Sequence, residues 1–217
     1  MVFPSSSAPI QVATAGEALI DMITESDGRL RPCAGGAVYN LTRALGLQGV
    51  GTLYLNPLSQ DRFGRLMADA IHQAGVTLAR EAPVHEPTSL ALVGLDEQGK
   101  ASYSFYRDGV ADRQVNAADM TAQCAAQPGL KVAVTGCLAL VADDSPKYLP
   151  WLQAQRAAGR LVVVDANLRP AIVPDMAAYQ ASVMAALGEA DIVKVSDDDL
   201  HILGFTLTDQ QKPCSCH

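Results

Sequence analysis

Residues Cys33 to Asn40, which read CAGGAVYN, form the most informative stretch of this sequence. The glycine pair, Gly35 and Gly36, opens a predicted helix, and Asn40 lies one turn inside it. Glycines allow the backbone to approach a ligand closely, and the free N–H groups of a first helical turn point toward such a ligand. The pattern therefore indicates either a site for a hydroxyl-rich or anionic small molecule or an ordinary tight turn.

The composition excludes several classes of function. The chain has 217 residues and a net charge of -7, and it contains no Lys/Arg cluster, which argues against nucleic acid as a partner. No apolar run is long enough to span a membrane, and residues 1–9 do not have the pattern of a secretory signal. The five cysteines are odd in number and scattered, so we expect no disulfide framework and a cytoplasmic location.

Apolar runs alternate between the periods of strands and helices. We expect strands over residues 12–23, 29–32, 49–55, 88–96, 101–107, 132–134, 161–164 and 191–195, and helices over 35–45, 63–74, 144–158 and 177–187. The later strands are continuously apolar, as in parallel sheets buried on both faces. Residues 88–107 predict a hairpin with its turn at 96–99. The pattern predicts a layered α/β domain with a β-rich excursion in its first half.

Polar residues follow three of the predicted strands. Asp21 lies near the end of the first, and residues 165–169 and 194–199 follow two later ones. In open α/β sheets ligands bind at the carboxyl ends of the strands, so these residues are candidates for one site. Each of them, taken singly, is equally compatible with a helix cap, a turn or an exposed charge.

The order of the motifs resembles the PfkB-type, or ribokinase-like, carbohydrate kinases, above all their bacterial fructokinase and 2-keto-3-deoxygluconate kinase branch. The segments that carry the resemblance are Gly16–Asp21, Gly35-Gly36 with Asn40, Asp61-x-Phe63-Gly64, Phe105-Tyr106-Arg107, Asp165-x-Asn167-x-Arg169 and Lys194-x-Ser196. The resemblance implies a C-terminally incomplete three-layer αβα domain over residues 10–204. It also implies a small β-sheet lid, with strands near 28–34 and 88–107. Residues 205–217 are expected to be an unrelated or disordered tail.

The same resemblance assigns the site residues. The sugar is expected to contact Asp21, Gly35, Gly36, Asn40, Phe105, Tyr106, Arg107 and Arg169, with Arg107 projecting from the lid. The implied cofactors are ATP and Mg²⁺, with Asn167, Lys194 and Ser196 near the nucleotide and Asp199 near the metal. The implied partners are a small sugar and a second copy of the chain, bound through the lid.

Three departures from the family pattern stand out. Asp199 occupies a position where the family usually has glutamate, and Cys33-Ala34 occupies one that often contains proline. The family's catalytic aspartate lies in a Gly-Ala-Gly-Asp motif, and this sequence contains no Gly-x-Gly-Asp, so no catalytic residue is assigned.

The resemblance implies ATP-dependent phosphorylation of a primary hydroxyl of a sugar, with fructose as the preferred substrate. Two alternatives stay open: that the chain is a catalytically inactive, truncated sugar-binding remnant, and that the substrate is 2-keto-3-deoxygluconate.

Overall fold

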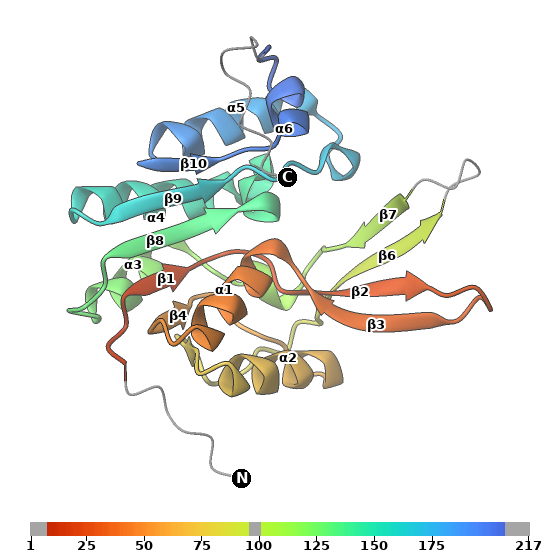
Figure 1. Cartoon of the computed structure of the whole chain (residues 1–217), viewed down its shortest axis with the longest axis horizontal. Coiled ribbons are helices and arrows are strands. Elements are labelled where there is room, and N and C mark those ends of the chain that lie inside the picture. The colour runs from red at the N-terminus through yellow and green to blue at the C-terminus, as the bar shows by residue number, and fades with distance from the viewer. Residues whose placement is uncertain (1–7, 96–100, 207–217) are drawn as a thin grey trace, which may run out of the picture.

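A six-stranded parallel sheet forms the centre of the computed structural model, which describes residues 8–95 and 101–206 (Figure 1). The strand order is β10-β9-β8-β1-β4-β5, and every pair in it is parallel. The strands are β1 (Val12–Thr14), β4 (Thr52–Tyr54), β5 (Thr77–Leu78), β8 (Val132–Gly136), β9 (Leu161–Asp165) and β10 (Ile192–Lys194). The order reverses beside β1, so the carboxyl ends of β1 and β8 flank a crevice of the kind in which α/β proteins bind ligands.

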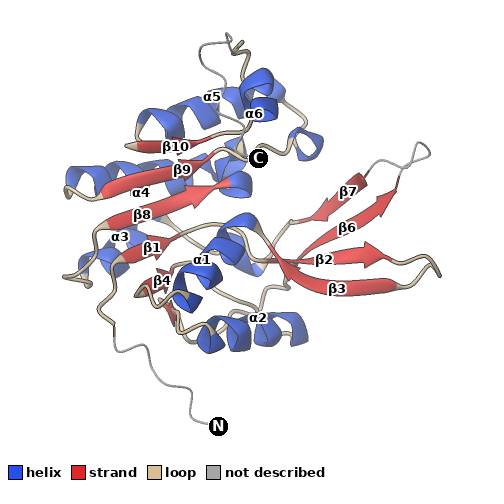
Figure 2. Cartoon of the chain, viewed as in Figure 1, coloured by secondary structure: helices blue, strands red, loops and turns tan. Residues whose placement is uncertain are grey.

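Helices cover both faces of this sheet (Figure 2). One face carries α1 (Ala37–Leu47) and α2 (Arg62–Gln73), and the other carries α3 (Ala117–Ala125), α4 (Ser145–Ala157) and α5 (Met176–Gly188). Alternate residues of β4 point to opposite layers, since Leu53 packs with the α3–α5 cluster and Tyr54 with the α1–α2 cluster. The predicted three-layer αβα architecture is therefore confirmed.

The short elements lie mainly around the carboxyl edge of the sheet. They are α6 (Asp197–Ile202) and four 3₁₀ turns, η1 (Ala111–Arg113), η2 (Cys137–Leu140), η3 (Ala142–Asp144) and η4 (Pro170–Ile172). Trp151 on α4 is the largest fully buried side chain, and it packs in the apolar cluster between the sheet and helices α3, α4 and α5.

A second sheet projects away from the main domain, as Figure 1 shows. Its strand order is β3-β2-β6-β7, formed by β2 (Leu19–Thr24), β3 (Leu30–Gly35), β6 (Ser89–Leu95) and β7 (Ala101–Tyr106). This is the predicted lid, and its β6–β7 pair is the predicted hairpin. The turn expected at residues 96–99 lies outside the described residues.

The prediction of one central strand over residues 12–23 is wrong. The chain leaves the main sheet after β1 and enters the lid as β2. Gly16 makes this crossing possible: its N–H donates to Asn56 Oδ1 at 2.7 Å, and a Cβ on it would lie 2.4 Å from Val38 Cγ2. Asp21 consequently lies on the lid and not at the end of a central strand.

Two helix predictions also need correction. Helix α1 begins at Ala37, because Gly35 ends β3 and Gly36 is the N-cap, with a φ of 105° that favours glycine. Helix α3 was not predicted, since its alanine-rich sequence lacks a strong apolar stripe; Asn116 caps it by accepting from the N–H of Asp119.

One face of the outer strands β9 and β10 is covered by no described helix. Leu161, Val163 and Ile192 lie on this face, and Ile192 is 52% exposed. Strand β10 also pairs only with β9 among the described strands, so its other edge presents unpaired N–H and C=O groups. Exposed apolar side chains beside a free strand edge favour association.

We expect Ile192→Thr to reduce self-association, because threonine keeps the strand propensity and removes apolar surface. Sedimentation velocity over a range of protein concentrations measures the effect. The matched control is Leu66→Thr, a similarly exposed apolar residue on α2. Equal behaviour of the wild type and both variants at all concentrations would contradict the expectation.

Candidate functional site

A cavity of about 290 Å³ lies where the lid meets the carboxyl edge of the main sheet. Six of the predicted site residues line it together: Asp21, Gly36, Asn40, Phe105, Asn167 and Arg169. They come from β2, the start of α1, β7 and the loop after β9, which are far apart in the sequence. Gly35 adjoins the cavity, because a Cβ on it would lie 2.2 Å from Asp21 Oδ2.

Opposite charges face each other across this cavity. Burial raises the pKa of Asp21, and the guanidinium of Arg169 opposes that shift. Arg169 also donates through Nη1 to the carbonyl oxygen of Leu168 at 2.9 Å, which holds its side chain against its own loop. Asn167 takes up a φ of 38°, a left-handed conformation that asparagine tolerates well. The loop therefore presents an amide and a cation to the same space as the carboxylate.

The glycine pair is held in place by Glu17, which sequence reasoning missed as a site residue. Glu17 Oε1 accepts from the N–H of Ala37 at 2.6 Å, and a Cβ on Gly36 would lie 2.6 Å from the Glu17 carbonyl oxygen. The Gly16-Glu17 pair could have indicated a turn that places Glu17 near the glycine pair. The prediction of one continuous strand over residues 12–23 excluded such a turn. Cys137 and Leu138 of η2 also line the cavity and were not predicted.

Arg107 does not project from the lid, so that prediction is wrong. Its side chain is only 10% exposed, and Nη2 lies 3.3 Å from Oδ2 of Asp112, whose side chain is 1% exposed. Asp112 also accepts from the hydroxyl of Ser89, and its carbonyl oxygen accepts from Asn56 Nδ2 at 2.7 Å. The guanidinium thus belongs to a buried polar network at the base of the lid. Its role as a sugar ligand stays a prediction.

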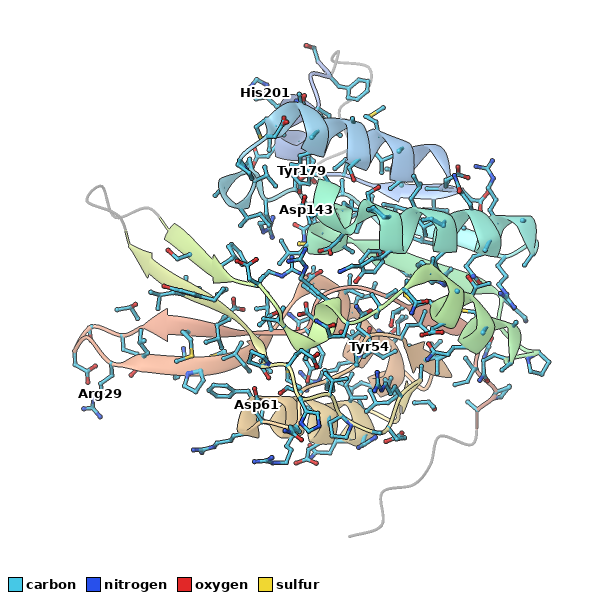
Figure 3. All side chains as sticks on the ribbon, turned by 180° about the vertical axis from the view of Figure 1, so that it is seen from behind. Arg29, Tyr54, Asp61, Asp143, Tyr179 and His201 are labelled. Carbon is cyan, nitrogen blue, oxygen red and sulfur yellow. The ribbon has the colours of Figure 1, made fainter. Side chains whose placement is uncertain are left out.

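Tyr106 lies outside the cavity. It is 61% exposed and lines a second, larger cleft of about 740 Å³, together with Phe105 and Arg107. Asp143 and Tyr179 line the same cleft from the main domain, and Figure 3 shows both on the side that faces the lid. We place the candidate site in the smaller cavity, because the predicted polar ligands gather there.

Of the predicted nucleotide and metal residues, Asn167 lines the smaller cavity, whereas Lys194, Ser196 and Asp199 line neither space. Lys194 Nζ forms an ion pair with Asp165 at 3.0 Å and stays largely exposed. Ser196 caps α6, and Asp199 completes the capping box by accepting from the N–H of Ser196 at 2.8 Å. The other carboxylate oxygen of Asp199 accepts from the N–H of Leu168 at 2.7 Å. Asp199 therefore joins α6 to the loop that carries Asn167 and Arg169.

Each oxygen of Asp199 already accepts one main-chain N–H, so the backbone fixes the carboxylate and leaves one lone pair on each oxygen. Within residues 8–95 and 101–206 there is also no group of three or more His, Cys, Asp or Glu side chains that could hold a metal ion. The assignment of Asp199 to the metal stays a prediction.

Comparison with known proteins identifies the family. Residues 10–212 match the pfkB family of carbohydrate kinases, and the chain belongs to this family. It is 30% identical over 202 residues to a fructokinase of Rhizobium leguminosarum bv. trifolii, a match that covers 89% of this chain and 60% of that protein. The chain thus spans about three fifths of the length of this curated relative.

Solved structures of fructokinases resemble this chain in fold. A fructokinase from Xylella fastidiosa with bound ATP superimposes with a TM-score of 0.77 at 27% identity, covering 90% of this chain and 64% of that one. A fructokinase from Vibrio cholerae O395 with fructose, ADP and calcium ion bound gives a TM-score of 0.74 at 26% identity, covering 93% and 65%. Among the described helices, none has the length and apolar character needed to cross a bilayer.

We expect Asp199→Asn to lower the free energy of unfolding by about 2 kcal/mol at pH 7, because the amide cannot accept both hydrogen bonds as a carboxylate does. Burial alone would raise the pKa of Asp199, but the N–H groups of Ser196 and Leu168 lower it below its ordinary value. A lowered folded-state pKa stabilises the protein above the unfolded-state value, and this stability is lost as the pH falls through the folded-state pKa.

The difference between wild type and variant should therefore shrink in acid below about pH 4. Urea unfolding at neutral and acid pH measures it. The control is Asp198→Asn, an exposed residue in the same helical turn. A loss of stability that persists unchanged in acid would contradict the role given to the Asp199 carboxylate.

Proposed function

We propose that this chain forms the sugar-binding part of an ATP-dependent carbohydrate kinase that acts on fructose. The observation that carries the proposal is the cavity itself. It collects a carboxylate, an amide and a guanidinium beside a glycine turn, at the carboxyl edge of a parallel sheet and beneath a lid. Its volume, at the lower end for small-molecule sites, suits a monosaccharide.

Each cavity residue has a chemistry that suits sugar hydroxyls. Asp21 can accept from two hydroxyls at once, and the Asn40 side chain can both donate and accept. Gly35 and Gly36 keep the entrance free of side chains, so the sugar can approach the backbone. Since Asp21 and Phe105 belong to the lid, closure of the lid would bring them onto the substrate and exclude water that competes for the phosphoryl group.

The charges around the cavity favour a neutral ketose over a keto acid. A carboxylate substrate needs a cation free to pair with it. Arg107 is already paired with Asp112, and Arg169 lies close enough to Asp21 to affect its titration. The three similar proteins reported above are each named as fructokinases, which supports the same choice.

ATP is the proposed phosphoryl donor, because bound ATP and ADP are named for two structural neighbours. In this chain Asn167 borders the cavity, and the exposed Lys194 lies at the carboxyl end of the neighbouring strand β10. An amide and an ammonium group are suitable donors for phosphate oxygens. The nucleotide would supply the γ-phosphoryl group for a primary hydroxyl of the sugar. A homodimer through the lid and a cytoplasmic location stay predictions.

We expect the chain to bind fructose about tenfold or more tightly than 2-keto-3-deoxygluconate, because Asp21 borders the same cavity as Arg169 and would repel the carboxylate of the keto acid. Isothermal titration calorimetry with both sugars measures this. Asp21→Asn should weaken fructose binding about tenfold, whereas Asp27→Asn, on the exposed turn of the same β2–β3 hairpin, should not change it. Tighter binding of the keto acid would reverse the substrate assignment.

A catalytically inactive sugar-binding protein is the second candidate, and one sequence observation favours it. The sequence contains no Gly-x-Gly-Asp, the motif whose aspartate the resemblance implies as the base for the attacking hydroxyl. We therefore expect the 217-residue chain to bind fructose without forming sugar phosphate from magnesium-ATP. A coupled assay for ADP release measures turnover, and clear fructose-dependent release would show that other residues complete the active site.

A further inference from the structure

Glu17 lines the cavity, and only one of its two carboxylate oxygens accepts a hydrogen bond from a described residue. The residue is 1% exposed, and its Oε1 accepts from the N–H of Ala37 at the start of α1. Its Oε2 is buried and has no hydrogen-bond partner among the described residues. Buried carboxylate oxygens without a partner are rare in folded proteins and call for an explanation.

The neighbours of Glu17 do not supply a strong donor. The thiol of Cys137 lines the same cavity and interacts with the Glu17 side chain, but a thiol is a weak donor. Arg107 exerts an electrostatic attraction on Glu17, and its Nη2 is paired with Asp112, but its Nε is buried and donates to no described residue, Glu17 included. Burial accordingly raises the pKa of Glu17, although its own main chain, Arg107 and Ala37 oppose the shift. A donor from outside the described residues would complete this group.

The backbone directs Glu17 and Asp21 toward the same space. Glu17, Leu19 and Asp21 all line the cavity, and they are spaced two residues apart along the segment that enters β2. In an extended chain, alternate side chains point to the same face. Two carboxylates therefore border the cavity, with Leu19 between them.

We propose that Glu17 is a specificity-determining residue whose Oε2 accepts a hydrogen bond from one hydroxyl of the bound sugar, while Oε1 holds the start of α1. The inference rests on the proposed function, because it assumes that the cavity takes a sugar. It identifies the ligand class more narrowly, as a neutral monosaccharide with a hydroxyl at the position that reaches Glu17. A sugar without that hydroxyl would leave the buried oxygen unpaired and would bind less well.

The experiment compares wild type, Glu17→Gln and the control Glu25→Gln, an exposed residue at the far end of β2. In Glu17→Gln the side-chain oxygen can still accept from Ala37, but the group offered to the sugar becomes a neutral N–H donor. Calorimetry gives the affinity of each protein for fructose and for its monodeoxy derivatives. Thermal unfolding without ligand checks that α1 remains in place.

We expect Glu17→Gln to keep a melting temperature close to that of the wild type and to bind fructose about fivefold to tenfold more weakly. For one monodeoxy derivative the wild type and Glu17→Gln should bind alike, because the hydroxyl that distinguishes them is missing. Glu25→Gln should match the wild type with every sugar.

Three outcomes would overturn the inference. If the wild-type chain binds no fructose, the proposed function fails, and this inference fails with it. If the wild type binds fructose and Glu17→Gln binds every sugar equally well, the inference alone fails. If Glu17→Gln weakens all sugars by the same factor, Glu17 acts only through the start of α1 and does not contact a hydroxyl.

Discussion

The structure depends on one contact, in which the segment between β1 and β2 packs against the start of α1. Glu17 accepts from the Ala37 N–H, while a Cβ on Gly36 would collide with the Glu17 carbonyl oxygen and one on Gly16 with the Val38 side chain. A helix N-terminus carries partial positive charge, which offsets part of the cost of burying the Glu17 carboxylate. This contact fixes the point where the chain leaves the main sheet, and with it the positions of the lid and the cavity.

A buried polar network at the base of the lid complements that contact. Asn56, which follows β4, donates to the carbonyl oxygen of Asp112 and to the hydroxyl of Tyr148. The carboxylate of Asp112 in turn pairs with Arg107. The network joins the main sheet, α4 and the lid hairpin within one set of hydrogen bonds. Because a buried charge that loses its partner is costly, these strands are held to one arrangement at the base of the lid.

Much of this architecture could be predicted from local sequence. The strand expected over 161–164 and the helix expected over 63–74 are both present, because their causes lie within a few residues. The break at Gly16 and the burial of Arg107 could not be predicted in the same way. The break depends on Asn56, which lies 40 residues beyond Gly16. Arg107 pairs with Asp112 only five residues away, but the position of Asp112 is fixed by Ser89 and Asn56, which local sequence does not reveal.

Trp151 is an intrinsic fluorescent probe that reports on one part of the molecule only. It is the only tryptophan in the chain, and it is fully buried on α4 within the α3–α5 layer. Its fluorescence should shift toward the red when that layer opens to water, and so follow unfolding of the main domain. The lid strands contain no tryptophan, so movement of the lid would leave this emission almost unchanged. The two kinds of motion can therefore be separated optically once a second fluorophore is attached to the lid.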